Sequence, residues 1–115
     1  MASLPPEFLR LADEARQHIR EVSPDEAKEL IRGGAVVLDV RDKEEYDQGH
    51  LESAVNISRG TLEMRVRDEI PDKDTPIVCH CLAGNRGALA ADTLRRMGYN
   101  NVVNIAGGLN AVQGE

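Results

Sequence analysis

The sequence predicts an α/β fold in which helices cover both faces of a parallel sheet, and three observations support this. Short apolar runs rich in β-branched residues alternate with segments of helical periodicity. The connections between the runs are too long for hairpins, so each crossover brings the next strand back in the same direction. The apolar content is aliphatic, with one Phe, two Tyr and no Trp in 115 residues, which suits a core between helices and a parallel sheet.

The N-terminal segment is predicted to be an amphipathic helix over about residues 5–20, because apolar residues recur there at helical spacing after two prolines. We expect residues 1–21 to form a helical extension that packs across the domain, and residues 22–115 to form the domain itself. A capping box then starts the next helix, with the Ser23 side chain and Glu26 satisfying each other's free backbone groups.

The elements that follow alternate between helix and strand. The expected strands are residues 36–40, 54–57, 76–81 and 101–105, four apolar runs bounded by turn-forming residues. The expected helices run from Pro24 to the glycine pair at 33–34, over 43–48, from Leu62 to Pro71, from the 84–87 stretch through Ala88, Ala91 and Leu94 to Gly98, and after the Gly107-Gly108 turn.

Charge and composition exclude several classes of function. A net charge of −6, from 14 basic and 20 acidic residues, argues against a non-specific nucleic-acid binder, which needs a basic face. The first 20 residues carry acidic side chains among the apolar ones, which is not typical of a signal peptide, and no stretch approaches the roughly 18 apolar residues of a membrane span. We therefore expect a cytoplasmic protein that contacts neither nucleic acid nor membrane.

Cys81 lies where chemistry is expected in this fold class, because ligands bind beyond the carboxyl ends of parallel strands. A loop of mostly small residues follows it and opens into a helix: Leu82, Ala83, Gly84, Asn85 and Arg86. The N–H groups of such a loop and the positive end of the helix both favour a thiolate, the species that attacks sulfur donors. We expect Cys81 to be a nucleophile rather than a packed apolar residue, and Arg86 to bind an anionic donor such as thiosulfate.

The two residues before Cys81 have simpler interpretations. Cys79 lies on the same side of the strand but deeper, which favours a core residue over a resolving thiol. His80 points to the opposite face, which favours a packed or partly exposed histidine over a general base. A disulfide between thiols two residues apart would be strained, and adjacent strand residues diverge too much for a Cys-His-Cys metal site.

Four pieces of sequence occur in an order and spacing typical of one family. They are Val37-Leu38-Asp39-Val40-Arg41 with Glu45-Tyr46 and Gly49-His50-Leu51; Ala54-Val55-Asn56-Ile57; residues 81–86; and Asn104-Ile105-Ala106-Gly107-Gly108-Leu109. Over roughly residues 22–111 the chain resembles the rhodanese homology domain family. The resemblance implies a rhodanese-like, five-stranded parallel sheet flanked by helices on both faces, with Cys81 as the sulfur-carrying nucleophile.

The resemblance also implies roles around that cysteine. Residues 82–86, with Gly87, would hold the transferred sulfur and the incoming anion, while Asp39 and Arg41 look like a buried polar pair that supports the site. Thiosulfate or a persulfide would give its sulfur to Cys81, and cyanide, a dithiol or a protein thiol would take it away. No metal or organic cofactor is required by this chemistry.

Two other functions remain open at this stage. The acidic segment 39–52, with six carboxylates against Arg41 and Lys43, could serve a persulfide carrier or interaction module that binds a basic partner. An arsenate reductase or phosphatase could use the same cysteine and arginine. The four residues between Cys81 and Arg86 resemble the shorter loop of the sulfur-handling members.

Three departures from the family pattern bear on these readings. Gly87 stands where relatives often have Ser or Ala, and Val112 where a Trp often follows the double glycine. The chain also ends at Glu115, earlier than many relatives, so we expect one sheet edge to be less well covered.

Overall fold

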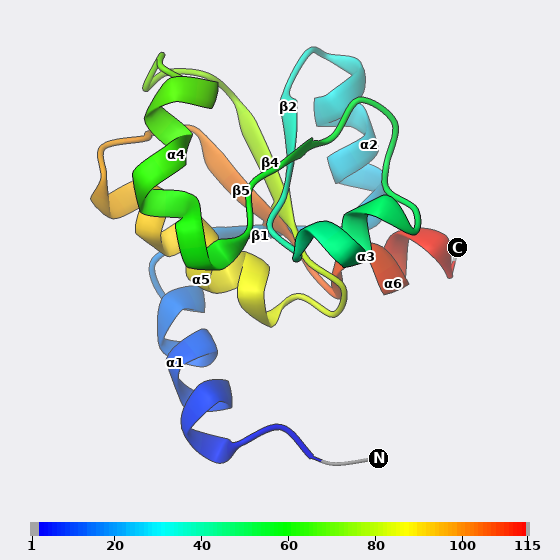
Figure 1. Cartoon of the computed structure of the whole chain (residues 1–115), viewed down its shortest axis with the longest axis vertical. Helices are drawn as coiled ribbons and strands as arrows, with labels where there is room; N and C mark the ends of the chain where they lie inside the picture. Colours follow the sequence, from blue (N-terminus) through cyan, green and yellow to red (C-terminus); the bar gives the residue numbers. More distant parts are fainter. Residues whose placement is uncertain (1–2, 115) are drawn as a thin grey trace.

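A parallel sheet is the frame that positions every other element. In the computed structural model, which describes residues 3–114, five strands run parallel in the order β1-β5-β4-β2-β3 (Figure 1). They are β1 (Arg20–Val22), β2 (Val36–Asp39), β3 (Val55–Asn56), β4 (Ile77–His80) and β5 (Val102–Ile105). The α/β class and the five-stranded sheet are confirmed. The ends of the two expected segments, residues 1, 2 and 115, lie outside the described residues.

Strand β1 is the element that the residue pattern does not predict. The helix expected over residues 5–20 is α1 (Pro6–Arg16), and the chain then turns into β1, which pairs with β5 at one edge of the sheet. Position 20 is therefore strand rather than helix. Of the three residues of β1 only Val22 is buried, so no apolar run marks this strand in the sequence. The division of the chain after residue 21 stays a prediction.

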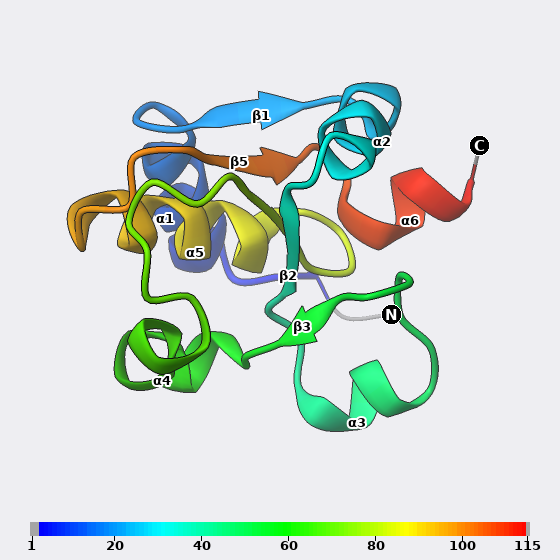
Figure 2. The same cartoon turned by 90° about the horizontal axis from the view of Figure 1, so that it is seen from above.

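The helices cover both faces of the sheet, as predicted. Helices α4 (Leu62–Glu69) and α5 (Asn85–Arg96) lie on one side, and α2 (Pro24–Arg32) and α6 (Gly108–Gln113) lie on the other (Figure 2). Helix α1 packs on α5 rather than on the sheet, burying Ala12 and Ala15. The short α3 (Lys43–Asp47) follows β2, and a single 3₁₀ turn, η1 (Arg59–Thr61), leads into α4.

Each face of the sheet carries its own apolar cluster because side chains alternate along every strand. The cluster under α4 and α5 contains Leu38, Val40, Ile57, Leu62, Val66, Ile70, Ile77, Cys79, Cys81, Ala90, Ala91, Leu94 and Tyr99. The cluster under α2 contains Val22, Ala27, Val78, Val103 and Ile105. The Ser23 Oγ accepts a hydrogen bond of 3.1 Å from the Glu26 amide, which is one half of the predicted capping box and fixes the start of α2. The Glu26 side chain pairs with Arg20 instead of completing the box.

The carboxyl ends of the neighbouring strands β2, β4 and β5 lie side by side at the same end of the sheet. Asp39 at the end of β2 is in register with His80 at the end of β4, and Cys79 is in register with Asn104 of β5. Cys81 and the Gly107-Gly108 turn follow directly from these ends. None of the helices in residues 3–114 combines the length and apolarity needed to cross a bilayer.

Candidate active site

Cys81 directly follows β4, and its sulfur meets an amide of the loop after it. The Gly84 N–H donates a hydrogen bond to Sγ over 3.0 Å. Gly84 has a φ of 114°, which favours glycine, and caps the 12-residue helix α5. The sulfur therefore faces the start of a helix, where an N–H group and the partial positive charge of the helix both stabilise negative charge. The residue itself is 1 % exposed.

The loop is held from behind by the turn that starts α6. The Leu109 amide donates to the Cys81 carbonyl over 2.8 Å, and the Asn110 amide donates to the Leu82 carbonyl over 2.9 Å. A Cβ on Gly108 would lie 2.6 Å from the Leu82 carbonyl oxygen, so this close approach requires glycine. The double glycine thereby fixes the direction in which the chain leaves Cys81.

Along the rest of the loop the side chains differ in exposure. Leu82 and Ala83 are exposed, Asn85 and Arg86 are half-buried, and Gly84 and Gly87 are buried. The residues that the sequence nominated for holding sulfur and anion thus form one continuous segment that leads from Cys81 into the first turn of α5. Its outer surface is apolar at Leu82 and polar at Asn85 and Arg86.

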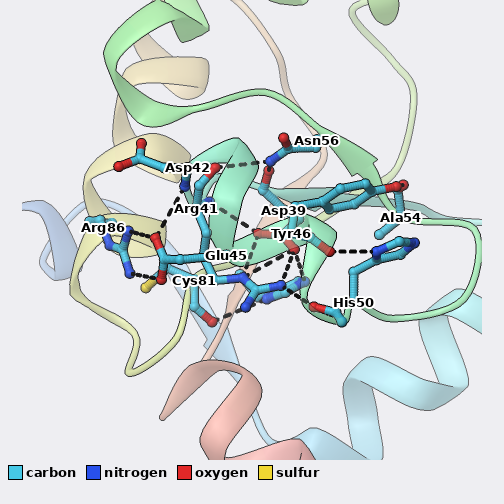
Figure 3. Close-up of polar contacts among 12 residues, drawn as sticks. Asp39, Arg41, Asp42, Glu45, Tyr46, His50, Ala54, Asn56, Cys81 and Arg86 are labelled. Carbon is cyan, nitrogen blue, oxygen red and sulfur yellow. Dashed lines mark hydrogen bonds and ion pairs between the residues drawn. The ribbon is translucent and has the colours of Figure 1, made fainter.

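Asp39 and Arg41 form a buried ion pair at the end of β2 (Figure 3). Arg41 Nε lies 3.0 Å from Asp39 Oδ1, and Nη2 lies 2.8 Å from Oδ2. Arg41 Nη2 also donates to the Gly49 carbonyl over 2.8 Å. The Asn56 amide donates to the carbonyls of both Asp39 and Arg41. Hydrogen bonding to Asp39 raises the pKa of Arg41 above its ordinary value, so this cation stays charged and paired.

Arg86 does not point freely at the sulfur but forms a bidentate pair with Glu45 of α3 (Figure 3). Its Nη1 and Nη2 lie 2.8 and 3.1 Å from the two carboxylate oxygens. Each side chain is about one-third exposed. Hydrogen bonding to Arg86 lowers the pKa of Glu45, and the same bond raises the pKa of Arg86. The sequence placed Glu45 in a family motif without giving it a role at the site.

The two residues before Cys81 are buried on opposite sides of β4. Burial raises the pKa of the Cys79 thiol, so this cysteine stays protonated in the apolar cluster, and both cysteines are free. Burial lowers the pKa of His80, whose Nδ1 lies 3.1 Å from the Cys81 carbonyl. Its Nε2 lies 3.8 Å from Asp39 Oδ2 and has no hydrogen-bond partner among the described residues. His80 is therefore a fully buried histidine between the ion pair and the loop.

Two further side chains that the sequence did not nominate contact the loop. The Asn104 amide donates to the Gly84 carbonyl over 3.1 Å, and Arg16 Nη2 of α1 donates to Asn85 Oδ1 over 2.9 Å. Asn104 is a polar residue inside an apolar strand, and that interruption is the signal that could have marked it. Arg16 lies 69 positions before Asn85 in the chain and carries no such signal.

The site can supply a sulfur nucleophile, an amide donor and paired charges. Within residues 3–114 no three His, Cys, Asp or Glu side chains come together in a way that could hold a metal ion.

Sequence comparisons find a family and several relatives that this chain resembles. The family model for the rhodanese-like domain matches residues 23–115. Thiosulfate sulfurtransferase PspE of Escherichia coli is 37% identical over 75 residues, which cover 65% of this chain and 71% of that protein. Thiosulfate sulfurtransferase GlpE of Pseudomonas entomophila is 35% identical over 89 residues, which cover 77% and 80%.

Solved structures with the same fold extend the similarity. The human single-domain sulfurtransferase TSTD1 superposes with a TM-score of 0.76 at 28% identity, covering 83% of this chain and 96% of that one. A protein of unknown function from Rhodopseudomonas palustris, described as a possible tyrosine phosphatase, gives a TM-score of 0.86 at 27% identity, covering 99% and 94%.

Proposed function

The chain belongs to the rhodanese-like domain family, and we propose that it is a sulfurtransferase that carries sulfur as a persulfide on Cys81. Relatives that act as thiosulfate sulfurtransferases support sulfur transfer as the general activity. The observation that carries the assignment to Cys81 is the 3.0 Å hydrogen bond from the Gly84 amide to Sγ at the start of α5. A thiolate and a persulfide anion are both stabilised by a donor in that place.

The proposed reaction has two steps that balance in atoms and charge. The Cys81 thiolate attacks the outer sulfur of thiosulfate, the S–S bond of the donor breaks, and sulfite leaves with the bonding electron pair. Cyanide or a thiolate then attacks the outer sulfur of the persulfide, and the Cys81 thiolate is released. The electron pairs move with the bonds that break and form, so the proposed reaction needs no external oxidant or reductant.

Cys81 is the carrier in this proposal because the other thiol lacks both features that favour a thiolate. Cys79 is fully buried, and that burial raises its pKa. The loop amide at Gly84 is directed at Cys81. Asp39 and Arg41 are proposed to support the site by fixing the chain after β2, without touching the sulfur that moves.

The charged side chains of the site bear on the identity of the sulfur donor. Arg86 is the cation nominated for an anionic donor, but Glu45 already neutralises it through two hydrogen bonds. A dianion such as thiosulfate must therefore compete with a carboxylate, whereas a persulfide donor carries less charge. The 1 % exposure of Cys81 favours a small donor or the terminal sulfur of an extended one. We propose that both donor types are used and that Glu45 limits the affinity for thiosulfate.

The proposed acceptors are cyanide, a dithiol or a protein thiol, and the proposed location is the cytoplasm. Nucleic acid is not a proposed partner, since the chain carries a net charge of −6. A membrane is not a proposed partner either.

Transfer of sulfur from thiosulfate to cyanide tests the assignment. We expect Cys81→Ser to abolish transfer and Cys79→Ser to keep most of it. Cys79→Ser is the matched control because it removes an equally small thiol two residues away. Equal loss in both variants would show that the carrier has been assigned to the wrong thiol. Transfer that persists in Cys81→Ser would remove this cysteine from the mechanism.

A phosphatase is the second candidate, because the R. palustris protein of very similar fold is described as a possible tyrosine phosphatase. Two features of this chain count against that activity. Four residues separate Cys81 from Arg86, and Arg86 is held by Glu45 rather than left to bind an oxyanion. Hydrolysis of an aryl phosphate that disappears in Cys81→Ser would favour the phosphatase. An intact enzyme that transfers sulfur but hydrolyses no phosphate supports our proposal.

A further inference from the structure

A chain of hydrogen bonds runs from α1 through the edge strand β1 and its neighbour β5 to the loop that follows Cys81. Arg16 Nε donates to Glu21 Oε2 over 3.2 Å. The same carboxylate oxygen accepts a hydrogen bond of 2.8 Å from Asn104 Nδ2. That amide also donates to the Gly84 carbonyl over 3.1 Å. Arg16 also contacts the residue after Gly84 directly, because its Nη2 donates to Asn85 Oδ1 over 2.9 Å. Residues 84 and 85 are thus held by side chains from β5 and α1.

The orientation of Asn104 follows from its partners. Both atoms that its Nδ2 faces, on Glu21 and Gly84, are acceptors, so the nitrogen must point toward them. Its Oδ1 then points at Gly87, where a Cβ would lie only 2.2 Å away. This buried oxygen has no hydrogen-bond partner among the described residues. An unpaired buried oxygen lowers the stability of the fold, so the favourable contribution of Asn104 must come from the two hydrogen bonds that its Nδ2 donates.

Gly84, whose carbonyl accepts a hydrogen bond from Asn104 Nδ2, is the residue whose amide contacts the Cys81 sulfur. Gly84 combines a left-handed φ of 114° with an amide that lies 3.0 Å from Cys81 Sγ. Glycine has the greatest backbone freedom of any residue, so an unrestrained Gly84 would let its N–H turn away. The bond from Asn104 adds to the bond from the Ala88 amide in holding its carbonyl, and the bond from Arg16 holds the side chain of the residue that follows it.

We propose that Arg16, Glu21 and Asn104 are positioning residues that keep the Gly84 amide directed at the Cys81 sulfur. This inference rests on the proposed sulfur transfer through Cys81. Glu21 links the other two, since it accepts from both. Arg16 and Glu21 precede residues 23–115, the segment that the family model matches. Helix α1 and strand β1 would therefore contribute to catalysis as well as to the fold.

The test uses a Cys79→Ser background, in which Cys81 is the chain's one remaining cysteine. Arg16→Ala and Glu21→Gln are compared with Arg10→Ala, which removes an exposed arginine from the same helix. Two quantities are measured: the thiosulfate-to-cyanide rate, and the rate of Cys81 alkylation by iodoacetamide as a function of pH. Circular dichroism checks that each variant is folded. Arg16 and Glu21 are about one-quarter exposed, so we expect both variants to fold.

We expect kcat to fall about three- to tenfold in Arg16→Ala and Glu21→Gln. This loss is smaller than the full contribution of one hydrogen bond to a charged group, because the variants weaken the hold on the Gly84 amide without removing the amide itself. The KM for thiosulfate should change less than kcat, because Arg86 and Glu45 keep their contacts. The alkylation profile should move to higher pH, because the variants weaken the hold on the Gly84 amide while the charged and titratable groups of the site stay the same, namely Asp39, Arg41, Glu45, His80 and Arg86. Arg10→Ala should match its parent in both measurements.

The two ways of failing are distinguishable. Folded Arg16→Ala and Glu21→Gln variants that transfer sulfur and react with iodoacetamide like their parent would overturn the positioning role and leave the proposed function intact. Transfer that survives Cys81→Ser in the otherwise wild-type chain would overturn the proposed function, and the positioning role with it.

Discussion

Replacing Asp39 by Asn should be among the most damaging single changes to the fold. The carboxylate is fully buried and receives hydrogen bonds from Arg41 Nε, Nη2 and the backbone amide. The substitution keeps the size of the side chain but removes its charge and turns an N–H₂ group toward donors. Arg41 is then left as a buried cation with only the Gly49 carbonyl as a strong acceptor. Breaking one side of such a pair costs about 3–5 kcal/mol, a large part of the roughly 5–15 kcal/mol that stabilises a domain.

Urea unfolding of four proteins measures this coupling directly. We expect Asp39→Asn and Arg41→Met each to lower the free energy of unfolding by about 3 kcal/mol, because each leaves one buried charge unpaired. The double variant buries no charge, so its cost should be far below the sum of the two. Asp47→Asn, which breaks an exposed pair with Lys43, should leave the urea midpoint unchanged. Additive single costs, or a loss below about 1 kcal/mol in Asp39→Asn, would refute this account of the pair.

Three more predictions concern the groups around the sulfur. Glu45→Gln should lower the KM for thiosulfate about two- to fivefold, because it frees Arg86 from a bidentate pair; a higher KM would show instead that Glu45 holds Arg86 in its working position. Gly87→Ala should destabilise the protein in thermal unfolding and slow transfer, although Ala favours helices by about 1 kcal/mol, because its Cβ would clash with Asn104 Oδ1; a gain in melting temperature would contradict this. Burial lowers the pKa of His80 below its ordinary 6.5. As the pH falls below 6.5, the unfolded chain therefore binds a proton at His80 that the folded chain does not bind. The free energy of unfolding that is present above pH 6.5 is lost as the pH falls toward the pKa of the folded state. Urea midpoints from about pH 7 to about pH 5 should therefore drop less in His80→Gln than in wild type.

Most of the fold followed from apolar periodicity and from turn-forming residues. The runs at 36–40 and 76–81 became the central strands β2 and β4, which are buried on both faces and so are apolar throughout. Strand β1 was not predicted, because an edge strand of three residues with one buried side chain produces no apolar pattern in the sequence. Its place in the sheet depends on pairing with β5, some 80 positions later in the chain. The local spacing of apolar residues does not predict such a long-range contact.

At the site, the sequence located the reactive element but not its partners. Cys81, the glycine-bearing loop and the start of α5 are consecutive in the chain, so their geometry is a local property. The pairing of Arg86 with Glu45 joins residues 41 positions apart. The contact of Arg16 with Asn85 spans 69 positions. These contacts depend on how α3 and α1 pack, which the residue pattern alone does not determine.

Locating the transferred sulfur by mass spectrometry tests the central claim most directly. The protein is incubated with thiosulfate, separated from the donor, digested under conditions that preserve persulfides, and mapped. We predict that the intact chain gains one sulfur atom, that the gain lies on Cys81 and not on Cys79, and that cyanide removes it. A chain that gains no sulfur, or that carries it on Cys79, would contradict the claim that the Gly84 amide and the helix start make Cys81 the sulfur carrier.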